Sequence, residues 1–125
     1  MEHNMVGWFE IPVNDMDRAK AFYEKVFHAT IGVHDLGGII MGWFPDAPGK
    51  KGASGSLVKH DMYKPSATDG PLIYFTCPDL SDELNRVEAA GGTIMQPKTE
   101  IGGGHGFMAL IRDTEGNRIA LHSQK

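Results

Sequence analysis

The sequence lacks a disulfide framework, a membrane-spanning run and a basic nucleic-acid-binding pattern. Cys77 is the single cysteine, so no disulfide can form within the chain, which fits a reducing cytoplasm. No apolar run approaches the roughly 20 residues that span a bilayer. The formal net charge is −4 and the positive residues are scattered, which argues against a nucleic-acid partner. The first residues also lack the basic and apolar segments of a signal peptide, so we expect a cytoplasmic protein without a membrane partner.

Length and composition favour one folded domain. The chain has 125 residues, of which 41% are apolar and 22% are charged, as is ordinary for a globular protein. A chain of this length buries roughly 65–70% of its unfolded surface on folding, so a core can form without stapling. We therefore expect a single domain over residues 1–125.

The first 58 residues show the pattern of a strand, a helix and three further strands. Residues 6–13 alternate between two faces, which predicts a strand with Trp8 and Glu10 on the same face. Asp15 is a good N-cap for a helix that begins at Met16. The expected apolar stripe of this helix consists of Met16, Ala19, Phe22, Tyr23, Val26 and Phe27. The three further strands are expected at residues 30–34, 38–44 and 53–58.

The pattern restarts after a segment without periodicity. Residues 59–70 carry polar, proline and glycine punctuation, which predicts a linker. A strand is then expected at residues 72–77, and Asp79 caps a second helix that Gly91 and Gly92 end. Further strands are expected at residues 93–96, 107–112 and 117–122, with a glycine-rich loop before the second and a tight turn at Glu115 and Gly116 before the third.

The restart is an internal repeat of pattern, offset by about 64 residues. Residues 9–16 align with residues 73–80, so that Val13 matches Cys77 and Asp15 matches Asp79. Module one covers about residues 6–58, the linker about 59–70 and module two about 71–125. We predict an α+β fold of two tandem βαβββ modules. Their open, cup-shaped mixed sheet leaves a concave, partly polar face suited to a small molecule.

Three segments resemble the vicinal oxygen chelate superfamily, which includes glyoxalases, extradiol dioxygenases and bleomycin-resistance proteins. They are VNDMDRAKAFYEKVF at residues 13–27, FTCPDLSDELNRVEAAGG at 75–92 and RDTEGNRIALHS at 112–123. The resemblance covers nearly the whole chain and implies paired βαβββ modules that form a cup. It also implies dimerisation and, in the enzymes, a divalent metal held by His, Glu or Gln. Those ligands stand at the start of each module's first strand and in each module's last strand.

The residues at the implied metal positions are not metal ligands. Three of these positions match Trp8, Leu72 and Ala120, and the fourth falls among Ser54, Ser56 and Val58. None of these side chains is a usual ligand for a divalent ion. We expect the standard metal site to be absent and predict no cofactor.

A polar cluster is expected further inside the cup than the implied metal positions. Glu10, Tyr74 and His122 each lie two residues beyond an implied metal position and share its face. Glu10 and His122 are therefore the candidate catalytic residues, because a carboxylate beside an imidazole can move a proton or orient a carbonyl group. Two other readings stay open: an internal ion pair that fixes the sheet register, or a His122 that meets solvent.

Four residues are candidates for ligand binding. Trp8 and Trp43 offer flat surfaces for stacking on the ligand, and Tyr74 adds a hydroxyl group. His105 lies in the GGGHG loop, which could act as a lid with a hydrogen-bond donor. The alternatives are core packing for the aromatic residues and an incidental histidine in a glycine-rich connection. Cys77 is expected to be a buried, inert thiol.

Three functions remain open on the sequence alone. The first is a glyoxalase- or bleomycin-resistance-like protein that binds a small organic molecule without a metal, acting as a homodimer. The second is a metal-dependent lyase, isomerase or dioxygenase with shifted ligands such as Glu10 and His122. The third is a structural or regulatory module with a filled cup. The sequence leaves open the ligand, whether the protein is an enzyme, and whether the modules pair within one chain or between two.

Overall fold

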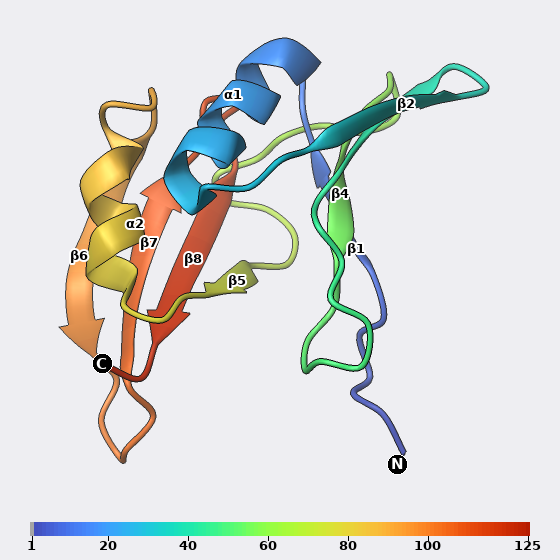
Figure 1. The fold of residues 1–125 in the computed structure, drawn as a ribbon. Coiled ribbons are helices and arrows are strands. Elements are labelled where there is room, and N and C mark those ends of the chain that lie inside the picture. Colours follow the sequence, from blue (N-terminus) through green and yellow to red (C-terminus); the bar gives the residue numbers. More distant parts are fainter. Residues whose placement is uncertain (1) are drawn as a thin grey trace.

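A computed structural model describes residues 2–125 as two four-stranded mixed sheets and two helices (Figure 1). The elements of module one are β1 (Phe9–Pro12), α1 (Met16–Phe27), β2 (Gly32–Leu36), β3 (Ile39–Trp43) and β4 (Gly55–Lys59). Those of module two are β5 (Ile73–Thr76), α2 (Leu80–Val87), β6 (Thr93–Glu100), β7 (Phe107–Arg112) and β8 (Arg118–Ser123). This arrangement confirms the predicted α+β fold of two βαβββ modules.

The two sheets have the same topology, and their parallel strand pairs have the same register. Their strand orders are β1-β4-β3-β2 and β5-β8-β7-β6, and in each sheet the first strand runs parallel to the last while the other pairs are antiparallel. Glu10 of β1 lies opposite Ser56 of β4, and Tyr74 of β5 lies opposite Ala120 of β8. Both residues of the second pair are 64 positions after their counterparts. The repeat detected in the sequence is therefore a repeat of strand pairing.

Both helices begin where the sequence predicts. The Asp15 carboxylate accepts a hydrogen bond of 3.0 Å from the backbone N–H of Arg18, and Asp79 accepts one of 3.0 Å from Ser81. The first helix ends at Phe27 and is capped by His28, whose φ of 51° is left-handed. No helix within residues 2–125 is long and apolar enough to cross a bilayer.

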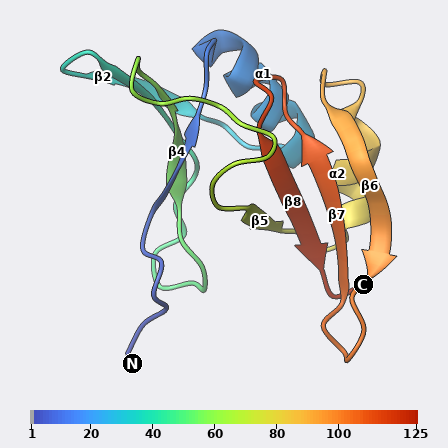
Figure 2. The ribbon, with the colours of Figure 1, turned by 180° about the vertical axis from the view of Figure 1, so that it is seen from behind.

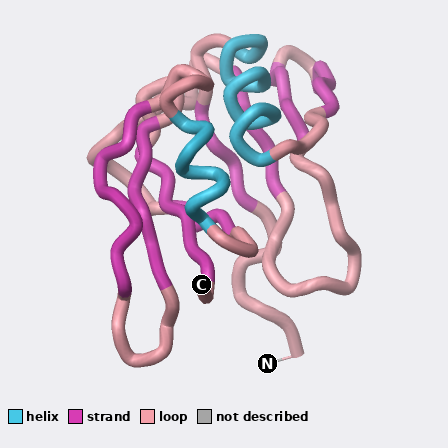
Figure 3. Tube along the Cα trace, turned by 60° about the vertical axis from the view of Figure 1, so that its left-hand side comes forward, coloured by secondary structure: helices cyan, strands magenta, loops and turns pink. Residues whose placement is uncertain are grey.

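The core lies on the helix-facing side of both sheets. Figures 1 and 3 show α1 and α2 side by side in this layer, and Figure 2 shows that the opposite face of the second sheet carries no helix. Alternation along the strands explains the burial: Ile11 and Val13 are 2% and 1% exposed, whereas Glu10, just before Ile11, points to the other face and is exposed. The other large, fully buried side chains include Phe22, Tyr23, Leu57, Leu80, Ile111, Ile119 and Leu121.

The sheets meet through aromatic side chains rather than through strand pairing. β1 and β5 are edge strands of separate sheets, so the single continuous cup is not closed by hydrogen bonds within residues 2–125. Instead, the rings of Phe9 on β1 and Phe75 on β5 lie edge to face at 5.8 Å. Such aromatic contacts pack the seam between the modules without fixing a strand register.

Hydrogen bonds join the turn between β7 and β8 of module two to the first helix of module one. Glu115 accepts backbone hydrogen bonds from Asn14 and Asp15, both at 2.8 Å. The Arg18 guanidinium donates a further bond of 2.7 Å to the same carboxylate. The buried Tyr23 hydroxyl donates to Asp113 of the same turn at 2.6 Å. A carboxylate is favourable here because the free N–H groups of a helix N-terminus carry partial positive charge.

Several strand boundaries differ from the prediction. β1 begins at Phe9 rather than residue 6, and β4 at Gly55 rather than residue 53. β6 continues to Glu100 rather than ending at Gln96. The extension contains Pro97, and β6 is the outer strand of its sheet, where proline is tolerated because it can lack a donor on the open side. The strand irregularity beyond Gln96 also lies in this stretch. β2 begins at Gly32, two residues later than expected.

Candidate functional site

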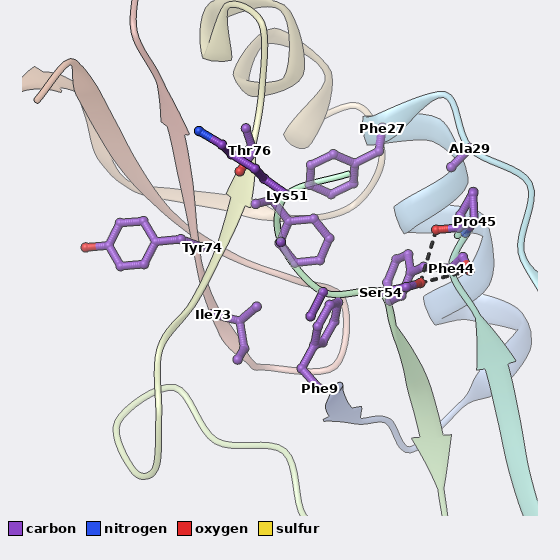
Figure 4. Close-up of a pocket in the computed structure, with 13 residues that line it drawn as sticks. Phe9, Phe27, Ala29, Phe44, Pro45, Lys51, Ser54, Ile73, Tyr74 and Thr76 are labelled. Atoms are coloured by element: carbon purple, nitrogen blue, oxygen red, sulfur yellow. Dashed lines mark hydrogen bonds between the residues drawn. The ribbon is translucent and has the colours of Figure 1, made fainter. Parts of the chain in front are cut away.

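A cavity of about 350 Å³ opens at the seam between the two modules (Figure 4). Its volume falls within the usual range for small-molecule sites. It is lined by β5, the end of α1 and the loop between β3 and β4. The lining residues are Phe9, Phe27, Ala29, Phe44, Pro45, Lys51, Gly52, Ala53, Ser54, Ile73, Tyr74, Phe75 and Thr76.

Four phenylalanines form the apolar wall of the cavity. The rings of Phe27 and Phe75 stack at 4.5 Å, and Phe44 lies edge-on to Phe75 at 5.6 Å. Phe9 completes the wall, 5.7 Å from Phe44. Strand alternation turns Phe9 and Phe75 toward the helices, and Phe27 is the last residue of α1. The resulting wall suits a flat apolar molecule.

The polar groups of the cavity lie at its rim. The Ser54 hydroxyl donates to the backbone oxygens of Phe44 and Pro45, at 3.3 and 3.1 Å, and so holds the loop before β4 (Figure 4). Lys51 comes from the same loop, and Thr76 from the end of β5. A ligand could therefore rest on apolar rings and find hydrogen-bond donors at the opening.

The predicted ligand-binding residues divide between the cavity and the open sheet faces. Tyr74 lines the cavity, although Figure 4 shows its ring pointing away from the centre. Trp8 and Trp43 do not line it and are 47% and 40% exposed. Trp43 instead lies beside His34, with ring centres 4.1 Å apart. A contact of these tryptophans with a ligand stays a prediction.

Glu10 lies in a second, more polar hollow of about 260 Å³. Its carboxylate accepts a hydrogen bond of 2.9 Å from Tyr63. This bond raises the pKa of the Tyr63 hydroxyl above its ordinary value, because losing the proton would set two negative charges together. Arg118, at the start of β8, lines the same hollow.

His122 lies elsewhere, beside the glycine-rich loop. Its Nε2 atom is 2.7 Å from the backbone oxygen of His105, and it donates to that oxygen when it carries the proton. His122 is four residues along β8 from Arg118, about 13 Å at 3.3 Å per residue. No ion pair joins Glu10 and His122 within residues 2–125. The structure thus brings His122 and His105 together, while catalytic roles for Glu10 and His122 stay predictions.

The residues at the family's metal positions do not fit a divalent ion. Trp8 and Leu72 directly precede β1 and β5, and Ala120 lies in β8. The matching registers identify the fourth position as Ser56, 64 residues before Ala120. The Ser56 side chain is fully buried and donates to the backbone oxygen of Leu57 at 2.7 Å. Within residues 2–125, no group of three or more His, Cys, Asp or Glu side chains is arranged to hold a metal.

Most of the cavity wall could not be identified from the sequence. Phe27 belongs to the expected apolar stripe of the first helix, and no pattern in the sequence marks Phe9, Phe75 or Lys51 as a binding residue. The one available signal was that phenylalanines recur on the apolar faces of several helices and strands. It could not identify a cavity, because core and cavity walls carry the same residues.

The sequence profile of the Glyoxalase/Bleomycin resistance protein/Dioxygenase superfamily matches residues 5–121. The chain belongs to this superfamily. This result confirms the resemblance seen in the sequence. The comparison with curated proteins gave no match.

Solved structures of this superfamily share the fold. Glyoxalase I from Zea mays is 17% identical with a TM-score of 0.69; the match covers 94% of this chain and 45% of that one. The chain therefore spans about half the length of the maize enzyme. TnmS3, an antibiotic-binding protein from Streptomyces sp. CB03234, is 22% identical with a TM-score of 0.68 and 98% coverage of both chains. A glyoxalase/bleomycin resistance protein/dioxygenase family enzyme from Burkholderia phytofirmans PsJN is 18% identical with a TM-score of 0.69, covering 95% of this chain and 98% of that one.

Proposed function

We propose that this protein binds a small, flat organic molecule in the cavity between its two modules, without the divalent metal of its enzymatic relatives. The observation that carries the proposal is the wall of four phenylalanines around an opening of about 350 Å³. An apolar wall with a few polar groups at the rim is the usual composition of a small-molecule site. The likeness to an antibiotic-binding protein of nearly equal length supports binding rather than turnover.

The proposal includes the assembly and the compartment. β1 and β5 are unpaired edges, and Trp8 and Trp43 expose apolar surface nearby, so we propose that two chains associate as a homodimer. A free Cys77 is compatible with a reducing cytoplasm. Under this proposal Tyr74 contacts the ligand from the rim of the cavity.

A filled-cavity variant tests the binding site directly. A panel of flat aromatic and alicyclic compounds is screened by thermal shift, because a ligand that binds only the folded state raises the melting temperature. Ala53 lines the cavity, so Ala53→Trp should remove the shift caused by each genuine ligand. Ala47→Trp in the same exposed loop is the matched control, because Ala47 does not line this cavity. No shift in the whole panel, or equal shifts in wild type and Ala53→Trp, would contradict the proposal.

A further inference from the structure

The cavity has one charged side chain, and it is positive. Lys51 is the sole charged residue among its lining residues, and no aspartate or glutamate lines it. This asymmetry is notable because the chain as a whole carries a formal net charge of −4. An anion at this opening therefore meets one ammonium group and no lining carboxylate. A cation would be repelled by the same ammonium group.

The Lys51 ammonium is free to bind a ligand. Lys51 takes part in no ion pair within residues 2–125. Figure 4 shows its side chain extending from the loop over the cavity toward β5, on the side of Thr76. The hydroxyl group of Thr76, which also lines the cavity, makes no side-chain hydrogen bond within the described part of the chain. The opening thus offers one cationic and one neutral donor.

Two carboxylates lie near Lys51 but outside the cavity. Glu2 lies with Lys51 around one neighbouring hollow, and Asp46 lies with Lys51 around another of about 120 Å³. Lys51 forms an ion pair with neither of them in residues 2–125. Asp46 therefore weakens the positive potential at the opening without neutralising Lys51.

We propose that the ligand of this cavity is a flat apolar molecule with one anionic group, such as an aromatic carboxylate, whose anion is held by Lys51 and the Thr76 hydroxyl while its rings lie on the phenylalanine wall. This inference rests on the proposed function and adds the chemical class of the ligand. Apolar contact supplies the bulk of the affinity, and the charge selects among ligands of equal size.

Three probes of matched shape test the selection. 2-Naphthoate is the anion, 2-naphthamide the neutral analogue and 2-naphthylmethylamine the cation at neutral pH. Titration calorimetry should show that wild-type protein binds the carboxylate about fivefold more tightly than the amide, as for a partly exposed ion pair, and the amine most weakly. The preference for the carboxylate should decrease as salt is added.

Charge variants of the loop complete the test. Lys51→Gln should reduce carboxylate affinity to that of the amide and leave amide affinity unchanged. Lys50→Gln is the matched control, because Lys50 is adjacent in sequence and does not line the cavity. Asp46→Asn should strengthen carboxylate binding. These exposed loop positions lie outside the core, so all three variants should retain the wild-type melting temperature.

The possible failures are distinguishable. If the amide and the carboxylate bind equally to wild type, or if Lys51→Gln leaves their ratio unchanged, the charge assignment is wrong while the cavity remains a binding site. If neither probe binds, or if Ala53→Trp binds both as well as wild type does, the proposed function fails with it.

Discussion

Cys77 is the one thiol of the chain, and its surroundings suppress its reactivity. The residue is 4% exposed and directly follows β5. Burial raises the pKa of the Cys77 thiol to about 12, and the nearby Glu83 carboxylate contributes to the increase. Because the thiolate is the reactive form, the thiol is almost entirely protonated at neutral pH.

We therefore predict that Cys77 reacts very slowly with Ellman's reagent in the native protein at pH 8. Only about one thiol in ten thousand is ionised four pH units below such a pKa. Unfolding in guanidinium should release one fast-reacting thiol per chain, which serves as the control. Complete labelling of native protein within minutes would show that Cys77 is accessible and ionised.

The residues at the four family metal positions lead to a second prediction at this scale. Trp8, Leu72, Ala120 and Ser56 offer no usual divalent-metal ligand. Protein purified without a histidine tag should contain no stoichiometric nickel, zinc, iron or manganese by elemental analysis, and a chelator should leave its melting temperature unchanged. One equivalent of tightly bound metal would favour shifted ligands such as Glu10 and His122.

At the scale of the elements, the turn between β7 and β8 joins module two to the first helix of module one. Glu115 lies in this turn and its side chain is fully buried, yet the pKa of its carboxyl group is lowered. Burial alone would raise this pKa; hydrogen bonds from Arg18 and from the N–H groups of Asp15 and Asn14 outweigh it. The charged carboxylate thus stabilises the junction between module two and the first helix.

The lowered pKa of Glu115 makes this junction sensitive to acid. The ordinary Glu value is 4.5, so the stabilisation is fully present above that pH and is lost as pH falls through the lower folded-state value. We predict that Glu115→Gln lowers the free energy of unfolding by about 1–3 kcal/mol at pH 7. Below about pH 4 the difference from wild type should diminish.

Chemical denaturation across pH measures this effect. Glu88→Gln is the matched control, because Glu88 is exposed at the end of α2, and it should change stability little at any pH. A Glu115→Gln variant as stable as wild type at pH 7 would show that the carboxylate charge does not hold the modules together.

At the scale of the whole molecule, the open sheets set the expected assembly. β1 and β5 leave unpaired edges at the seam, and each sheet also has an outer edge at β2 or β6. The large exposed apolar residues include Trp8, Leu36, Trp43, Tyr74 and Met95. Unpaired edges next to apolar surface are favourable for association with a second copy.

We predict a symmetric homodimer at micromolar concentration. Light scattering coupled to size exclusion should give about twice the chain mass of 13.7 kDa. Trp43→Lys places a charge on this exposed surface and should shift the protein toward the monomer without changing its fold by circular dichroism. A wild-type monomer at these concentrations would contradict the prediction, because the unpaired strand edges and exposed tryptophans would then not cause association.

The sequence by itself determined the elements and their repetition. Period-two alternation put Trp8 and Glu10 on one face of the first strand, and both are exposed, while aspartate caps located the starts of both helices. These signals are local: they depend on backbone geometry and on neighbours within a few positions. The continuation of β6 past Pro97 has no local signal, because the tolerance of proline depends on which strand lies at the edge of the sheet.

Only the tertiary structure decided where the cavity lies and which residues face it. Phe9 and Phe75 meet across a seam between separate sheets, and Lys51 reaches the same opening from a third segment. The relative placement of the modules depends on long-range contacts such as those of Glu115 with Arg18, which no local pattern encodes. For the same reason the expected pairing of Glu10 with His122 could not be judged from alternation: a shared face does not set the distance along the strands.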